Sequence, residues 1–199
     1  MLTSEALNDV ECEAFFYSVE AREFGREHGG MLNMEFYIQM HEKISLEKRE
    51  QIKWLDETLA AMDPKSMKIV VGHHAMESAS LVHGPRPLMN VAIRPILKSY
   101  GVDLYICGHD HNLQHLHRRY EHLHHIVVGG GGFVTTPTSL HPVYSTPEYP
   151  ALVYGDSTFG FVAATARKDS LHLEFIDYFG SIIYNTTIPT GDRRQITVR

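Results

Sequence analysis

The sequence lacks any long apolar run, and it contains only two cysteines. No stretch approaches the roughly 20 consecutive apolar residues that a transmembrane helix needs, so we expect no membrane partner. The opening segment, residues 1–9, is polar and acidic, which is not the pattern of a signal peptide, and the compartment stays unknown. Cys12 and Cys107 are too few for a disulfide framework, and we expect Cys107 to be a free thiol on a buried strand.

Positive charge is scarce as well. The chain has 18 Lys and Arg residues against 24 Asp and Glu residues, which gives a formal net charge of −6. This balance argues against nonspecific binding to nucleic acid, so we expect no nucleic-acid partner. An apolar content of 43% is ordinary for a globular protein, and 199 residues are enough for one domain with a sizeable core.

Histidine, in contrast, is abundant, and two short histidine signatures each follow an apolar run. The first, Val70–His74, ends in Gly-His-His, and the second, Tyr105–Asn112, contains Gly-His-Asp-His-Asn. Each pattern indicates a buried strand that ends at a glycine and then presents imidazoles. Enzymes with parallel sheets place their binding groups in such loops, beyond the carboxyl ends of the strands. We therefore predict a metal site formed by His73, His109 and His111, because neutral imidazole is a common metal ligand.

The segments around these signatures alternate between helix and strand. Apolar residues recur at helical spacing after Ser45, a plausible N-cap, and Pro64 follows the end of that pattern. We predict a strand over 67–71, a helix over 87–100 and a second strand over 103–107, each strand followed by a histidine loop. This order predicts an α/β (or α+β) fold with a sheet covered by helices.

The remainder of the chain gives weaker signals. Residues 1–44 stay unassigned apart from two candidate strands, 14–19 and 34–40. The histidine-rich stretch 111–125 favours a half-exposed strand pair, with an accessory metal patch as the alternative. Gly129–Gly132 lacks the lysine of a phosphate-binding P-loop and favours close backbone packing beside the site.

The C-terminal third combines a loop with strands. Residues 134–157 are rich in Thr, Pro and Ser, and we predict a long surface loop there. Residues 160–164, 171–176 and 181–185 have the alternation of an antiparallel meander, with turns near residues 168–169 and 179–180. We treat residues 1–199 as a single domain.

Several segments together resemble the C-terminal half of a calcineurin-like metallophosphoesterase, most closely the small tartrate-resistant type of purple acid phosphatase. The resemblance covers residues 45–187 and leaves 188–199 as a tail. The segments that carry it are Gln51–Leu55, Val71–His74, His83–Pro85, Leu104–Leu113, Gly160–Val162, Phe175–Tyr178 and Tyr184–Thr187. The block Gly-His-Asp-His-Asn is the most specific of them.

The resemblance implies a four-layer αββα sandwich with a dinuclear metal centre between the strand ends. It implies that His73 and His109 bind one divalent ion and that His111 binds the other, as iron with zinc, iron or manganese. His83, before Gly-Pro, matches a histidine that holds or protonates the leaving group of the substrate. His74 stands where many relatives have tyrosine, which implies a place outside the ligand set.

The function implied is acid-phosphatase-type hydrolysis of phosphate monoesters by two metal ions. The ions hold the phosphate and generate the attacking hydroxide, and a protonated histidine helps the leaving alkoxide depart. Phosphate ester is the expected substrate. Members of this family are often secreted or lysosomal, although no signal peptide is evident in this chain.

The sequence departs from the family in its N-terminal motifs. The Asp-x-His, Gly-Asp and Gly-Asn-His motifs are missing, because the two Gly-Asp pairs, at 155–156 and 191–192, lie too near the C-terminus. Asp9, Glu11 and Glu13 are poor substitutes, since no strand followed by glycine places them. We therefore expect an incomplete centre, a partial domain or fragment, and a missing N-terminal half as a possible partner.

Two alternatives follow from this departure. The chain could be a non-catalytic remnant that binds one metal ion or a partner chain. It could also be a metal-storage or interaction module centred on the histidines of residues 111–125, which predicts several weak sites.

Overall fold

The structure is a computed structural model, and it describes residues 49–85, 87–118, 121–132, 134–138 and 151–189. Residues 2–61 form one compact unit, and the residues from Met62 onward form the other. The candidate strands at 14–19 and 34–40 and the N-cap predicted at Ser45 lie outside the described residues.

The described part of the first unit is a helix over residues 49–61. Leu55 and Leu59 are buried, and they lie four residues apart on one helical face, as the apolar spacing predicts. Trp54 beside that face is about half exposed, and Lys53 forms an exposed ion pair with Glu57 at 3.7 Å. The predicted helix is confirmed over these residues.

A mixed five-stranded sheet forms the centre of the second unit. Its strands are β1 (Ile69–Val71), β2 (Leu104–Cys107), β3 (Leu113–His117), β4 (His124–Val128) and β5 (Ala151–Asp156), in the order β1-β2-β4-β3-β5. β1, β2 and β4 pair in parallel, whereas β3 pairs antiparallel with β4 and β5. The strands predicted at 67–71 and 103–107 are confirmed. The loop predicted over 134–157 is wrong at its end, because β5 completes the sheet there.

The C-terminal meander forms a second, antiparallel sheet. Its strands are β6 (Gly160–Ala166), β7 (Ser170–Asp177) and β8 (Ile182–Pro189). Alternation along β7 buries Leu171, Leu173 and Phe175 on one face and turns the residues between them to the other. The predicted meander and its turns are confirmed.

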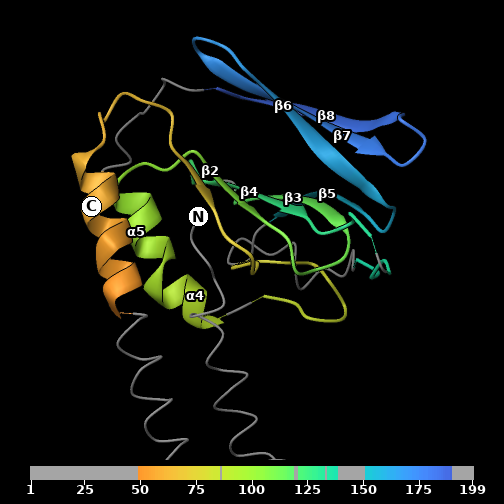
Figure 1. The fold of residues 1–199 in the computed structure, drawn as a ribbon, viewed down its shortest axis with the longest axis horizontal. Coiled ribbons are helices and arrows are strands. Elements are labelled where there is room, and N and C mark those ends of the chain that lie inside the picture. The colour runs from red at the N-terminus through yellow and green to blue at the C-terminus, as the bar shows by residue number, and fades with distance from the viewer. Residues whose placement is uncertain (1–48, 86, 119–120, 133, 139–150, 190–199) are drawn as a thin grey trace, which may run out of the picture. The chain divides into compact units, whose positions relative to one another are not determined.

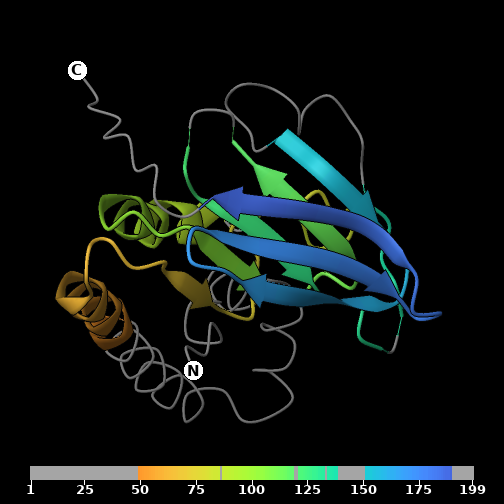
Figure 2. The ribbon, with the colours of Figure 1, turned by 90° about the horizontal axis from the view of Figure 1, so that it is seen from above.

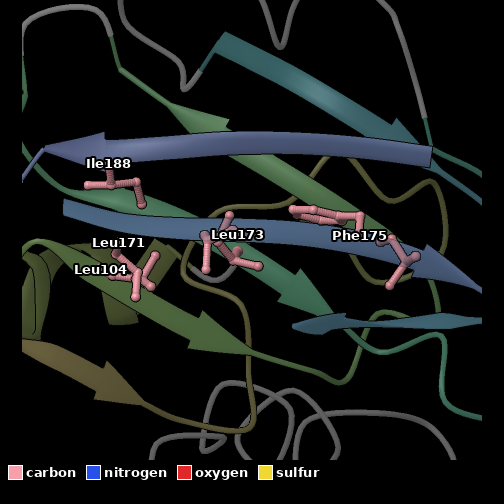
Figure 3. Close-up of a cluster of buried hydrophobic side chains, with 7 residues drawn as sticks. Leu104, Leu171, Leu173, Phe175 and Ile188 are labelled. Atoms are coloured by element: carbon pink, nitrogen blue, oxygen red, sulfur yellow. The ribbon is translucent and has the colours of Figure 1, made fainter. Parts of the chain in front are cut away.

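The two sheets pack face to face around one apolar core. Figure 3 shows residues of β7 and β8 meeting Leu104 of the five-stranded sheet. The buried members of this core are Leu104, Leu113, Ile126, Leu171, Leu173, Phe175 and Ile188. Figure 2 shows the three-stranded sheet lying across the strands of the other sheet. In Figure 1, α4 (Pro87–Ala92) and α5 (Arg94–Ser99) lie to the left of and below the labelled strands of the five-stranded sheet.

The single helix predicted over 87–100 is two short helices in the structure. The break falls at Ile93, two residues before Pro95, which has no backbone N–H and whose ring excludes a continuous helix. Apolar periodicity continues across the break, and Leu97 is fully buried. In the part of the chain that the structure describes, no helix has the length and apolar character needed to span a membrane.

Candidate metal centre

The pairing of β1 with β2 brings the two histidine loops to the same edge of the sheet. Val71 at the end of β1 is in register with Ile106, near the end of β2. Two backbone hydrogen bonds also connect the loops. The Gly72 amide donates to the Ile106 carbonyl and the Gly108 amide donates to the His73 carbonyl, both at 2.9 Å. The parallel register therefore places His73 beside the loop that contains His109.

The glycine before each signature histidine has a different role in the two loops. A side chain at Gly72 would collide with the Tyr105 hydroxyl, 2.2 Å from the position of the added Cβ, whereas Gly108 has only ordinary contacts. In the second loop it is His109 itself that has a left-handed backbone, with φ of 64°. A non-glycine residue rarely adopts this conformation, so the loop holds His109 in a strained geometry.

The glycine run packs closely against this second loop. An added Cβ at Gly129 would lie 1.9 Å from the carbonyl oxygen of Asp110, and one at Gly130 would lie 2.7 Å from that of Thr158. Gly131 has open space at the same position. The close packing expected from the sequence is therefore present at the first two glycines of the run.

Three histidine rings meet where the two loops converge. The ligand atoms of His73, His74 and His109 all lie within 4.8 Å of one another. His73 Nε2 and His109 Nδ1 are 3.3 Å apart, and the ring centroids of His74 and His109 are separated by 4.4 Å. His73 is exposed, His109 is half-buried and His74 is buried, so the group extends from the surface into the interior.

The segment that carries His73 and His74 is fixed to the sheet by buried amide groups. The side-chain carbonyl of Gln114 on β3 accepts a hydrogen bond from the Ala79 amide at 2.8 Å. Its side-chain nitrogen donates to Ser78 Oγ at 3.0 Å and to Asn112 Oδ1 at 2.7 Å, and Asn112 donates in turn to Thr136. Gln114 and Asn112 are fully buried and bonded, so these contacts hold the segment in one conformation.

A buried ion network fixes the same segment from the helical side. The Glu77 carboxylate pairs with the guanidinium groups of Arg94 and Arg118, and Arg94 also pairs with Glu121. Burial raises the pKa of Glu77, and the two arginines oppose that shift. Neither these residues nor the buried amides were singled out from the sequence, because their role depends on contacts between segments far apart in the chain.

Comparison with known sequences places this arrangement in a family. The chain matches the family described as Calcineurin-like phosphoesterase over residues 4–113, more than half of its length. The chain belongs to this family. The match begins within the segment that sequence patterns left unassigned.

Similar sequences include acid phosphatases of mammals and plants. The chain is 31% identical over 147 residues to tartrate-resistant acid phosphatase type 5 of Rattus norvegicus, which covers 73% of this chain and 44% of the relative. It is 37% identical over 117 residues to purple acid phosphatase 17 of Arabidopsis thaliana, which covers 59% of this chain and 33% of the relative. The resemblance to purple acid phosphatases is confirmed, and the chain spans less than half the length of these relatives.

Solved structures share the fold at low sequence identity. A purple acid phosphatase from yellow lupin seeds has a TM-score of 0.62 and 22% identity, covering 72% of this chain and 29% of that one. GAP50, described as the anchor in the inner membrane complex of Plasmodium, has a TM-score of 0.59 and 22% identity, covering 79% and 45%. Proteins with different roles share this phosphoesterase fold, so function has to be argued from the site.

The three-histidine group contains two of the three histidines predicted as metal ligands. His73 and His109 are adjacent, and the His83 ring lies 4.3 Å from that of His109. His111 is not in the three-histidine group, whereas His74, which the resemblance placed outside the ligand set, is a member. The adjacent pair in Gly-His-His was the available signal for His74, although sequence alone does not show which of two neighbouring rings faces the other loop.

The donor set of this group fits one transition-metal cation. Three imidazoles are typical ligands for zinc, and a 3.3 Å spacing between nitrogens suits two ligands of the same ion. No carboxylate belongs to the group within the described residues. The group therefore fits one ion of the dinuclear centre expected in the family, and the second ion needs further ligands.

The histidines of β3 and β4 form a separate, buried cluster. His115 Nδ1 lies 2.9 Å from the Tyr184 hydroxyl, and His115 Nε2 lies 2.9 Å from His124 Nδ1. Burial lowers the pKa of His115 to about 4 and that of His124 to about 3. The predicted strand pair is confirmed, but it is mostly buried and not half exposed. Within the described residues, these histidines form no group of three with metal-ligand spacing.

Proposed function

We propose that this chain supplies histidine ligands to a metal-dependent phosphoric ester hydrolase of the acid phosphatase type. The convergence of His73, His109 and His83 at one edge of the sheet supports this proposal most directly. The names of the similar mammalian and plant proteins, which are acid phosphatases, add support for phosphate monoesters as the substrate class.

The residues have distinct roles in the proposed reaction. His73 and His109 bind one ion, and His111 binds a second, following the motif of the family. Bound ions would neutralise the charge of the phosphate and supply hydroxide for in-line attack. His83 is exposed and lies beside His109, where it would donate a proton to the leaving alkoxide oxygen.

The proposal requires carboxylate ligands in addition to the histidines. Imidazoles are neutral ligands, so two multivalent ions at close spacing need anionic groups between them. Since the described histidine group contains no carboxylate, these ligands would come from residues outside this group or from a second polypeptide. Iron paired with zinc, iron or manganese is the metal combination that we propose.

Metal content and hydrolysis of an aryl phosphate between pH 4 and pH 8 test the proposal together. We expect His109→Gln to abolish turnover and reduce bound metal, and His83→Gln to reduce turnover while leaving metal content unchanged. His172→Gln on β7, remote from the metal group on the three-stranded sheet, serves as the matched control. Turnover that survives His109→Gln would contradict the proposal.

One observation favours a second candidate function. The described histidine group contains no carboxylate, so it suits one bound ion and offers no bridging ligand for the second ion that two-metal hydrolysis requires. In that case the chain binds one metal equivalent, and it shows no turnover when iron, zinc or manganese is added.

A further inference from the structure

Three histidine rings meet at the carboxyl ends of β1 and β2, whereas the motifs assign only His73 and His109 to one ion. We propose that His73, His74 and His109 form a three-histidine site for one divalent transition-metal cation, with His74 as the third ligand. The inference rests on the proposed function for the ion at His73 and His109. It assigns to His74 a ligand role that neither the motif nor the resemblance gives it.

The spacing of the ring nitrogens supports this site. Zinc binds histidine nitrogen at about 2.0–2.1 Å, so two ligands at a tetrahedral angle lie about 3.3–3.4 Å apart. His73 Nε2 and His109 Nδ1 are 3.3 Å apart and meet this requirement. The ligand atom of His74 lies within 4.8 Å of both, so it needs to move inward by at most about 1.5 Å.

A buried tyrosine holds the backbone of His74 in place. Its carbonyl oxygen accepts a hydrogen bond from the Tyr105 hydroxyl at 2.8 Å, and Tyr105 is itself buried on β2. The His74 ring is 4.8 Å from that of His73 and 4.4 Å from that of His109, in centroid distance. His74 therefore closes the buried side of the group, while exposed His73 borders the side open to solvent.

This arrangement has the character of a reactive metal site. Structural zinc sites have four protein ligands, whereas catalytic sites have three and keep one position for water or substrate. Three neutral imidazoles leave the full charge of a dication uncompensated, which favours an anionic ligand such as phosphate at the open position. The proposed site thus takes a divalent cation first and a phosphate group second.

Zinc titration of the whole chain by calorimetry, with Zn²⁺ alone as the probe, tests the role of His74. We expect one strong site, and we expect His74→Gln to weaken it at least tenfold, as His73→Gln does. His172→Gln on β7 is the surface control and should leave this site within twofold of the unmodified chain. His74→Cys should recover much of the affinity, because a thiolate is also a zinc ligand.

The cysteine variant separates ligation from packing. If His74→Gln and His74→Cys weaken zinc equally, His74 acts through packing, and the inference is wrong. Zinc affinity that is unchanged in His74→Gln, or lost equally in His172→Gln, would also overturn it while leaving the proposed function intact. If His73→Gln and His109→Gln have no effect on zinc, the proposed function fails together with the inference.

Discussion

Two groups of histidines stand out among the described residues, one on loops and one on strands. The loop group, His73, His74, His83 and His109, follows the ends of β1 and β2, and its members range from exposed to buried. The strand group, His115, His124 and His125, lies on β3 and β4 and is largely buried. Histidine is thus used in two ways within one sheet.

The two groups differ in the partners of their ring nitrogens. In the strand group, His115 lies within hydrogen-bond distance of both Tyr184 and His124. In the loop group, the contacts between rings bring nitrogens together without a carboxylate among them. Strands fix side chains by pairing and packing, whereas loops beyond strand ends aim several side chains at one point. The comparison teaches that density of histidine alone does not identify a metal site.

Acid should destabilise the protein through the strand group, and this is the largest expected effect. Burial lowers the pKa of His115 to about 4 and that of His124 and His125 to about 3, while an unfolded histidine titrates near 6.5. Between these values the unfolded chain binds more protons, so the free energy of unfolding falls as pH decreases. For each of these histidines, the free energy of unfolding of the protein should fall by about 2 kcal/mol between pH 7 and pH 5.

Urea unfolding at pH 7, 6 and 5 measures this effect. His124→Gln should make the dependence on pH shallower, because glutamine does not titrate. A free energy of unfolding that stays constant from pH 7 to pH 5 would show that the strand histidines are not buried in their neutral form.

Zinc affinity should depend on the loop group and not on the strand group. His109→Gln is expected to weaken zinc binding at least tenfold, because it removes a ligand atom. His124→Gln should lower thermal stability and leave zinc affinity unchanged. Calorimetric titration of both variants at pH 7 decides this, and equal zinc loss in the two would show that the groups are not distinct.

For the strand group, the sequence was enough to predict the secondary structure but not the burial of the side chains. Alternation in β3 and β4 was enough to predict a strand pair, but not the second sheet that covers it, since that contact joins β3 to β8, about 70 residues away. The proximity of His73 and His109 could be predicted from the motifs, because each follows the end of one of two parallel strands. The proximity of the His74 ring to His109 could not be predicted from the sequence, because it depends on how two loops far apart in the chain converge.

The contact between the Tyr184 hydroxyl on β8 and His115 on β3 should contribute moderately to stability. Tyr184→Phe removes the hydroxyl that lies 2.9 Å from His115 Nδ1 and leaves that buried nitrogen without its partner. We expect a loss of about 1.5 kcal/mol in the free energy of unfolding at pH 7. Tyr178→Phe in the exposed turn after β7 is the matched control and should change stability little, and equal losses in the two variants would contradict the assignment.

The smallest effect concerns the backbone of the loop group. His109 has a φ of 64°, a conformation that disfavours side chains with a Cβ and that glycine adopts freely. In the metal-free protein, His109→Gly should therefore be more stable than His109→Ala by about 1 kcal/mol, measured by thermal unfolding. The comparison uses two variants that both lack the imidazole, so the difference reports backbone strain alone. If alanine is as stable as glycine, the loop is not strained, and His109 needs no functional reason for its place there. If glycine is more stable, the imidazole is kept at the expense of stability, which is the relation expected of a metal ligand and not of a strand histidine.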